Sequence, residues 1–316
     1  MGGKTVVLNS ARMNYDGKLD MSVLSSDVTE YAVTEQDQIL ERVQGMDVVV
    51  TKEMPVSGEI IAQFPDSVKL ICEAGTGYNN IDIEAARAKG ITVCNIPAYS
   101  TERVAHTAIM MILNLSSTMQ VQQAMLTKGD RSNFTKCLQV NHVEVNGKTL
   151  GVIGAGTIGR EVIKVAQALG MKILAYTRTP RADEENLRYV SLEELLKESD
   201  YISLHCPLTP QTRHLINKET IAMMKPTAFI INTGRGALID EPALIEALQK
   251  GQIAGAGLDV QETEPPAQDN PLYDMPNVIL TPHMGWKGLE TRQRLVSILA
   301  ANIKGFTEGH PQNVVS

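Results

Sequence analysis

Short apolar runs alternate with amphipathic stretches along the first hundred residues. The runs at 5–8, 48–51, 69–72 and 91–94 are rich in β-branched residues and are apolar on both faces. Between them, apolar residues recur at helical spacing over residues 35–44, 58–64 and 83–89. Strands that are apolar on both faces and are separated by helices predict a parallel α/β sheet.

A second series of the same kind begins near residue 147. The pattern predicts one long helix over 101–125, a polar surface loop over 128–145 and a final helix over 289–306. The repeated strand–helix–strand order is typical of a doubly wound sheet, so the sequence predicts two α/β domains. Strands of the second series are predicted over 149–153, 172–176, 201–204, 228–232, 255–259 and 278–280, and helices over 158–169, 192–197, 218–223 and 241–250.

Composition narrows the class of protein. The chain has 316 residues, 43% of them hydrophobic and 21% charged, which agrees with two globular domains. Its net charge of −7 would repel a phosphate backbone, so we expect no nucleic-acid partner. The longest apolar run, residues 108–113, is far below the ~20 residues of a membrane span, and residues 1–10 lack a signal-peptide pattern. We therefore expect a cytoplasmic protein with no membrane partner.

The cysteines indicate neither disulfides nor metal binding. Cys72, Cys94, Cys137 and Cys206 form no CxxC pair, and their spacing matches no zinc motif. Three of them, Cys72, Cys94 and Cys206, lie in apolar strand-like runs, where free cysteines are usually buried. We expect reduced thiols and no metal site.

A glycine-rich turn follows the predicted strand 149–153. Gly154, Gly156 and Gly159 match the pattern GxGxxG, and Thr157 and Ile158 open the next predicted helix. The pattern alone is weak, but a place between a strand and a helix is the context of a dinucleotide site. Glycines let the backbone approach a pyrophosphate closely, and the helix N-terminus offers it unpaired N–H groups. A plain structural turn is the alternative.

The end of the following strand distinguishes NAD from NADP. An acidic residue at this point binds the ribose hydroxyls of NAD. This chain has Arg178 and Thr179 instead, and the first carboxylate comes only at Asp183. Because arginine and hydroxyl groups suit a 2′-phosphate, the sequence favours NADP over NAD. If Arg178 merely stacks on the adenine, both cofactors would bind.

Three ionisable residues follow predicted strands of the second series. They are Arg235, Glu264 and His283. The carboxyl ends of parallel strands are where such sheets hold their ligands, so these residues are candidates for a catalytic site. From spacing alone, each could equally be an ordinary surface charge.

Several segments, in their order and spacing, resemble the D-isomer-specific 2-hydroxyacid dehydrogenase family over nearly the whole chain. Each segment is modest, but the set in this order is specific. The segments are residues 75–82 (GTGYNNID), 95–102 (NIPAYSTE), 154–159 (GAGTIG), 205–209 (HCPLT), 232–236 (NTGRG), 257–260 (GLDV), 264–265 (EP) and 282–283 (PH).

The resemblance implies roles for the three candidates. Arg235 would bind the carboxylate and the carbonyl oxygen of a substrate, because a planar guanidinium suits bidentate contacts. His283 would be the general acid/base, donating a proton to the carbonyl oxygen as the cofactor delivers a hydride. Glu264 would hold the orientation of His283 and favour its imidazolium form.

The resemblance also implies the wider binding sites. For Asp259 the alternative is a buried carboxylate that serves only as scaffold, for Tyr99 a core residue, and for Trp286 an ordinary interface aromatic. The implied cofactor-binding residues are Gly154, Gly156, Thr157, Ile158, Gly159, Arg178, Thr179, Cys206, Pro207, Thr212, Thr233, Gly234, Asp259 and Gly285. The implied substrate-binding residues are Thr76, Gly77, Tyr99, Arg235, His283 and Trp286.

The fold implied by the resemblance has two doubly wound parallel-sheet domains. A Rossmann-type cofactor domain, residues 101–287, would be inserted in a flavodoxin-like substrate domain formed by residues 1–100 and 288–316. The family is usually a homodimer joined through its cofactor domains, so a homodimer is expected.

Within the family, the chain looks most like the hydroxypyruvate reductases, also called glycerate dehydrogenases. Residues 95–101 and Trp286, three residues past His283, carry this likeness. We expect reversible NADP- or NAD-dependent reduction of a small 2-keto acid, hydroxypyruvate or glyoxylate, to the D-2-hydroxy acid. D-lactate or a bulkier D-2-hydroxy acid is the alternative substrate. A dinucleotide-sensing, corepressor-like binding protein is the alternative from another class.

Overall fold

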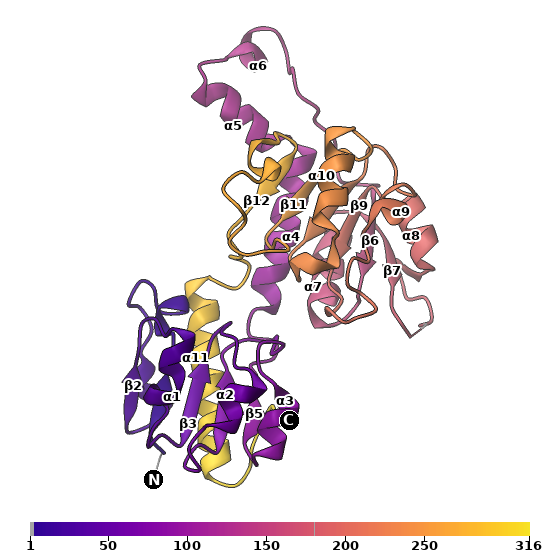
Figure 1. The fold of residues 1–316 in the computed structure, drawn as a ribbon. Helices are drawn as coiled ribbons and strands as arrows, with labels where there is room; N and C mark the ends of the chain where they lie inside the picture. Colours follow the sequence, from indigo (N-terminus) through magenta and orange to yellow (C-terminus); the bar gives the residue numbers. More distant parts are fainter. Residues whose placement is uncertain (1–2, 180) are drawn as a thin grey trace. The chain divides into compact units, whose positions relative to one another are not determined.

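The computed structural model describes residues 3–179 and 181–316, which form two compact units (Figure 1). Unit 1 comprises Met1–Ser100 and Trp286–Ser316, and unit 2 comprises Thr101–Gly285. The sequence places the end of the second domain at residue 287, whereas the compact unit ends at Gly285. The division into a substrate domain and a cofactor domain stays a prediction at this point.

Unit 1 is built on a five-stranded parallel sheet with the order β2-β1-β3-β4-β5, which is the flavodoxin-like order. The side chains of β1, β3 and β4 are all buried, which explains why these strands are apolar on both faces. The sequence pattern missed β2, because this edge strand is short and half-exposed. The strands are β1 (Thr5–Val7), β2 (Val28–Glu30), β3 (Val48–Thr51), β4 (Leu70–Glu73) and β5 (Thr92–Cys94).

The helices of unit 1 have clear local start signals. The Ser57 side chain caps α2 by accepting the N–H of Ile60, and Asp82 caps α3 by accepting the N–H of Ala85. The last helix, α11, packs its buried face on the apolar side chains of β3 and β4. The helical elements of unit 1 are η1 (Ser10–Arg12), η2 (Met21–Leu24), η3 (Gln36–Gln38), α1 (Ile39–Arg42), α2 (Gly58–Ala62), α3 (Ile83–Ala88) and α11 (Leu289–Thr307).

Unit 2 is built on a seven-stranded parallel sheet with the order β12-β11-β10-β9-β6-β7-β8. The order reverses at β6, as in a Rossmann-type doubly wound sheet. Only β8, another short edge strand, is absent from the sequence prediction. The strands are β6 (Thr149–Ile153), β7 (Lys172–Tyr176), β8 (Leu187–Tyr189), β9 (Tyr201–Leu204), β10 (Phe229–Asn232), β11 (Gly255–Leu258) and β12 (Val278–Leu280).

Helices cover both faces of this sheet. Buried side chains of α4 and α7 pack on one face, and those of α8, α9 and α10 pack on the other. The predicted fold class, two doubly wound parallel-sheet domains, is confirmed. The elements are α4 (Thr101–Ser116), α7 (Thr157–Ala168), α8 (Leu192–Glu198), α9 (Lys218–Ile221), η4 (Gly236–Leu238), α10 (Glu241–Gln249) and η5 (Pro271–Asp274).

The single helix predicted over 101–125 is wrong. The backbone of Thr118 has a φ of 51°, in the left-handed region, so the chain breaks between α4 and α5 (Met119–Thr127). The Thr118 hydroxyl donates a hydrogen bond to the carbonyl oxygen of Asn141, which holds this break. The predicted loop 128–145 contains one short helix, α6 (Ser132–Thr135). We call residues 119–147 the arm, since it stands away from the body of unit 2 (Figure 1).

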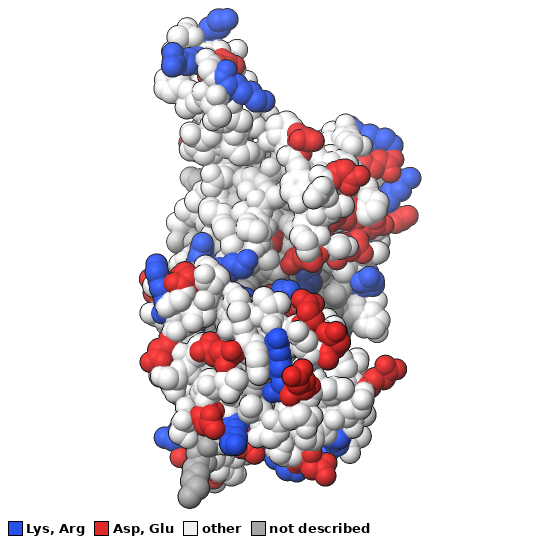
Figure 2. All heavy atoms as spheres, turned by 60° about the vertical axis from the view of Figure 1, so that its left-hand side comes forward, with Lys and Arg blue, Asp and Glu red and all other residues white. Residues whose placement is uncertain are grey.

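Charged side chains are spread over the surface. Acidic and basic groups are interspersed on the face shown in Figure 2, and basic groups gather at the end of the arm. Among the described residues, no helix is both long enough and apolar enough to cross a membrane.

Candidate active site

The glycine-rich turn lies where β6 ends and α7 begins. Gly154 has a φ of +99°, and a Cβ there would lie 2.5 Å from the backbone nitrogen of Cys206, so only glycine fits. A Cβ on Gly159 would lie 2.1 Å from the carbonyl oxygen of Gly154, which explains how α7 can start directly against the turn. These two glycines are therefore required by the turn itself.

Gly156 has a different environment. A Cβ at this position would meet no heavy atom within 4 Å, and its φ of −82° suits any residue. It is the N-cap of α7, and no described side chain caps this helix end. The exposed Thr157 and the half-buried Ile158 follow it. The open space and the uncapped N–H groups fit the pyrophosphate of a dinucleotide.

A buried hydroxyl lies just beyond β10. Thr233 is 8% exposed, and its Oγ1 has no hydrogen-bond partner among the described residues. Buried hydroxyls normally have a partner, so this atom fits a ligand that lies along the strand ends. The next residue, Gly234, donates its N–H to Asn232 Oδ1 at 3.0 Å, which shapes the turn.

The segment after β9 forms a turn in which the Thr212 hydroxyl is already hydrogen-bonded. Thr212 Oγ1 donates to the carbonyl oxygen of Pro207 at 2.7 Å and accepts the N–H of Thr209 at 2.8 Å, so it closes its own turn. Cys206 lies beyond the strand and is partly exposed, contrary to the predicted burial in a strand. Burial nevertheless raises the pKa of the Cys206 thiol to about 11, and burial lowers the pKa of His205 to about 4. The thiol and the imidazole are both neutral near pH 7.

Arg178 and Thr179 follow β7 and are exposed. The acidic residues closest along the chain are engaged elsewhere. Asp183 Oδ1 accepts the N–H of Tyr189 at 2.7 Å, and Glu184 forms a two-bond ion pair with Arg160, each bond 2.7 Å long. No described carboxylate at this strand end is thus poised for the ribose hydroxyls of NAD.

Glu264 and His283 come into direct contact. His283 Nδ1 lies 2.8 Å from Glu264 Oε2, and Glu264 Oε1 accepts the backbone N–H of Gln261 at 3.1 Å. His283 has a φ of 47°, and its N–H is held by the carbonyl oxygens of Asp259 at 2.9 Å and Thr281 at 3.0 Å. With Nδ1 at the carboxylate, Nε2 is the ring nitrogen left for a substrate.

Asp259 holds the segment that carries His283. Its carboxylate, in a residue only 1% exposed, accepts hydrogen bonds from Thr281 Oγ1 at 2.6 Å and from the N–H groups of Met284 and Gly285, each at 2.8 Å. A Cβ on Gly285 would lie 2.8 Å from Asp259 Oδ2. These side-chain contacts of Asp259 therefore hold the loop that carries His283.

Arg235 shares a cavity with the Glu264–His283 pair. It is half-buried directly after the turn at Gly234, and its Nη1 donates to the Gly234 carbonyl oxygen at 2.9 Å. The cavity has a volume of about 220 Å³. Unit 2 thus brings together all three residues that the sequence proposed for chemistry. The cavity is lined by Leu208, Arg235, Gly236, Ala237, Val260, Gln261, Glu262, Glu264 and His283.

In unit 1, Thr76 and Gly77 lie in the loop after β4. Thr76 Oγ1 donates to the carbonyl oxygen of Ile96 at 2.9 Å, and Asn95 Nδ2 donates to the carbonyl oxygen of Thr76 at 2.8 Å. Both hydrogen bonds fix the conformation of the loop, and neither involves its backbone N–H groups. Among the residues that the structure describes, the amides of Thr76 and Gly77 meet no acceptor.

Tyr99 and Trp286 belong to one core cluster of unit 1. They are 3% and 5% exposed, and the Trp286 Nε1 is buried without a hydrogen-bond partner in the described part of the chain. The ammonium nitrogen of Lys52 lies 3.9 Å from the centre of the Trp286 ring. An unpaired buried N–H next to a cation is unusual for a plain core residue, so it fits a binding role.

Sequence reasoning missed two groups of charged residues. Lys52 is buried, binds Glu53 at 2.6 Å and lies near the buried Glu73, whose pKa is raised by burial in spite of the lysine. A charge directly after the apolar run 48–51 could have pointed to Lys52. His214 and Glu262 pair at 2.7 Å beside the cavity, and nothing in the sequence marks this contact because the two residues are 48 positions apart.

Known proteins place the chain in a family. The family described as "D-isomer specific 2-hydroxyacid dehydrogenase, NAD binding domain" matches residues 109–285. A hydroxypyruvate reductase of Blautia hydrogenotrophica is 42% identical over 289 residues, which cover 90% of this chain and 89% of the relative.

Solved structures agree with this match. A D-lactate dehydrogenase of Aquifex aeolicus, complexed with NAD and lactic acid, superposes with a TM-score of 0.84 at 32% identity, covering 97% of this chain and 96% of that one. An acyclic imino acid reductase in complex with NADPH and D-Arg has a TM-score of 0.84 at 28% identity, over 99% and 100% of the two chains. The protein is an oxidoreductase that belongs to the D-isomer specific 2-hydroxyacid dehydrogenase family.

Proposed function

We propose that the protein reduces a small 2-keto acid, hydroxypyruvate or glyoxylate, to the D-2-hydroxy acid, reversibly and with NADPH or NADH. The observation that carries this proposal is the contact between His283 and Glu264 in the cavity that Arg235 also lines. An acid/base group, a carboxylate that orients it and a guanidinium are the groups that carbonyl reduction needs. The relative named hydroxypyruvate reductase supports the choice of substrate.

When bound, the nicotinamide supplies the hydride that C2 of the keto acid receives. His283 donates the matching proton from Nε2 to the carbonyl oxygen, because its Nδ1 faces Glu264. Glu264 stabilises the imidazolium before the transfer and keeps the ring in place afterwards. Arg235 binds the substrate carboxylate and polarises the carbonyl oxygen. In the oxidation direction, neutral His283 takes the proton back.

Residues of unit 1 complete the proposed substrate set. The amide N–H groups of Thr76 and Gly77 would bind the carboxylate, as expected for N–H groups that no described acceptor meets. Tyr99 and Trp286 would contact the substrate carbons, and the unpaired Trp286 Nε1 would suit the 3-hydroxyl group of hydroxypyruvate. Residues 1–100 with 288–316 are accordingly proposed as the substrate domain, and 101–287 as the dinucleotide-binding domain.

NADP is the preferred cofactor in this proposal. Arg178 and Thr179 are exposed at the end of β7, where they could bind a 2′-phosphate. The described acids nearby, Asp183 and Glu184, already have partners. The turn at Gly156, with Thr157 and Ile158, would hold the pyrophosphate, and Thr233 would lie along the cofactor.

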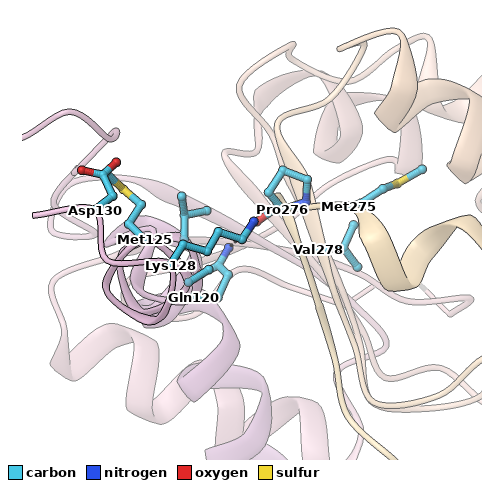
Figure 3. Close-up of a pocket in the computed structure, with 9 residues that line it drawn as sticks. Gln120, Met125, Lys128, Asp130, Met275, Pro276 and Val278 are labelled. Atoms are coloured by element: carbon cyan, nitrogen blue, oxygen red, sulfur yellow. Dashed lines mark hydrogen bonds between the residues drawn. The ribbon is translucent and has the colours of Figure 1, made fainter. Parts of the chain in front are cut away.

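A homodimer is proposed, with a second copy of this chain covering the arm of unit 2. Phe134 in α6 is 78% exposed, and several other apolar side chains of the arm are exposed too. A cavity of about 280 Å³ lies at the base of the arm, between residues of α5 and the segment 275–278, and Lys128 extends towards Pro276 across it (Figure 3). Exposed apolar groups of this extent favour burial against another subunit.

Steady-state oxidation of NADPH and of NADH tests the proposal, with hydroxypyruvate, glyoxylate, pyruvate and phenylpyruvate as parallel substrates. We expect the highest kcat/KM with hydroxypyruvate or glyoxylate and NADPH. A preference for pyruvate or phenylpyruvate would refute the substrate assignment alone. If no 2-keto acid were reduced with either cofactor, the proposed activity would be wrong.

A further inference from the structure

His214 lies between the two loops that carry the proposed catalytic residues of unit 2. One loop follows β10 and contains Arg235, and the other follows β11 and contains Glu264. We propose that His214 is a positioning residue that ties these loops together and thereby sets how Glu264 meets His283. This inference rests on the proposed function, because it assigns His214 a task in the same reaction.

The backbone around His214 is joined to the Arg235 loop. The N–H of His214 donates to the carbonyl oxygen of Ala237 at 2.8 Å, and the N–H of Ile216 donates to that of Leu238 at 3.0 Å. Ile216 and Ile239 form a parallel β-bridge. His214 itself has a φ of 51°, in the left-handed region, so the backbone turns sharply at this residue.

The side chain of His214 is joined to the Glu264 loop. Its Nε2 lies 2.7 Å from Glu262 Oε1, two residues before Glu264. The N–H of Glu262 donates to Glu241 Oε2 at 3.1 Å, which anchors the loop to the first turn of α10. Arg213 also approaches Glu262, with its Nη2 3.9 Å from Glu262 Oε1. His214 is therefore the shortest side-chain contact to Glu262 among the residues described.

The two loops also pass close to each other, so a displacement of Glu262 has only a short distance to travel to Glu264. A Cβ on Gly236 would lie 1.8 Å from the carbonyl oxygen of Gln261, which shows how closely the backbones pass. The N–H of Gln261 then holds Glu264 Oε1 at 3.1 Å, while Oε2 holds His283. A change in the Glu262 position would pass through this segment to the carboxylate that orients His283.

Because the His214–Glu262 pair is exposed to solvent, a substitution there can change the position of Glu264 without a large change in stability. The His214 and Glu262 side chains are 38% and 25% exposed, and a contact between side chains that are this accessible to water contributes little to folding. Removal of the His214 ring should leave the fold intact. Any change at His283 then reports a change in position, since His214 does not touch His283 in the structure.

The test compares His214→Ala, His214→Gln and the matched control Arg188→Ala. Arg188 pairs with Glu194 at 2.9 Å on the surface of unit 2, away from the cavity. Glutamine can still donate an N–H to Glu262, so His214→Gln should restore what alanine loses. We expect His214→Ala to lower kcat about three- to tenfold, the worth of one hydrogen bond, with NADPH affinity unchanged.

The second readout is the ring resonances of His283, followed by NMR at a single pH in the protein without cofactor and assigned with His283→Gln. A displaced Glu264 should shift these resonances in His214→Ala, because Glu264 Oε2 lies 2.8 Å from His283 Nδ1, and should leave them unchanged in Arg188→Ala. Unchanged His283 resonances in His214→Ala overturn the proposed positioning role, and so does an equal loss of kcat in Arg188→Ala. If the wild type reduces no 2-keto acid, the proposed function fails, and the resonances of His283 still decide the role of His214.

Discussion

The open space over Gly156 gives a sharp test of the dinucleotide turn. In Gly156→Ala the added Cβ meets no heavy atom within 4 Å, and the φ of −82° is ordinary for alanine. The fold should therefore keep its stability, or gain about 0.4–1 kcal/mol because the unfolded chain loses freedom. If a pyrophosphate approaches the backbone at this point, the same methyl group occupies its space.

The expected loss of affinity follows from the hydrogen bonds at the start of α7. A methyl group over Gly156 would push the pyrophosphate away from the uncapped N–H groups of Thr157 and Ile158. Loss of one hydrogen bond to a charged group costs about 1.5–3 kcal/mol, which corresponds to roughly 10- to 150-fold in Kd. Isothermal titration with NADPH and NADH measures this change, and differential scanning calorimetry measures stability.

Gly159→Ala is the matched control, with the opposite expectation. Its Cβ would lie 2.1 Å from the carbonyl oxygen of Gly154, so α7 must shift and stability should fall by about 3 kcal/mol. The reasoning is refuted if Gly156→Ala binds both cofactors as tightly as the wild type does. It is also refuted if Gly156→Ala loses as much stability as Gly159→Ala.

Three further predictions concern stability and assembly. Burial lowers the pKa of His205 from 6.5 to about 4, so between these pH values the unfolded chain binds a proton that the folded chain does not. The free energy of unfolding should therefore fall by about 3 kcal/mol as the pH drops from 6.5 to 4, and pH-dependent urea denaturation should show that His205→Asn lacks this change. Arg292→Met removes a buried guanidinium that binds Asp16 through two bonds of 2.9 and 2.8 Å and donates to the carbonyl oxygen of Met13 at 2.9 Å. Because that buried carbonyl loses its partner, the free energy of unfolding, again by urea, should fall by about 1–3 kcal/mol. Phe134→Asp places a charge on the exposed ring position of the arm. Sedimentation should show a dimer for the wild type, as proposed, and monomers for the variant; an unchanged mass would contradict the proposed interface.

The proposed catalytic site was predictable as far as it depends on strand ends. Arg235, Glu264 and His283 each follow a strand that the apolar pattern located, and the parallel sheet brings those ends to one edge. The sequence could not predict that Asp259 would bind the Met284 and Gly285 amides, because that contact depends on how the His283 loop turns. The family resemblance named the residues, and the geometry shows how they are held.

The parts that were wrong or missed have local physical causes. The helix over 101–125 keeps its apolar spacing across Thr118, so the pattern gives no sign of the left-handed residue that breaks it. The edge strands β2 and β8 are three residues long and partly exposed, so they lack the apolar runs that identified the central strands. Short-range patterns identify apolar runs well, including the edge strands β5 and β12, and identify short strands without such a run poorly.

The sequence by itself determined the buried strands, the two parallel sheets and the glycine-rich turn between β6 and α7, because burial on both faces and the GxGxxG context are local properties of the chain. Only the tertiary structure decided which side chains meet. His214 reaches Glu262 across 48 positions, and Lys52, directly after β3, reaches the ring of Trp286 far later in the chain. Such contacts depend on strand order and loop geometry. These follow from the packing of the whole unit rather than from any short stretch of residues.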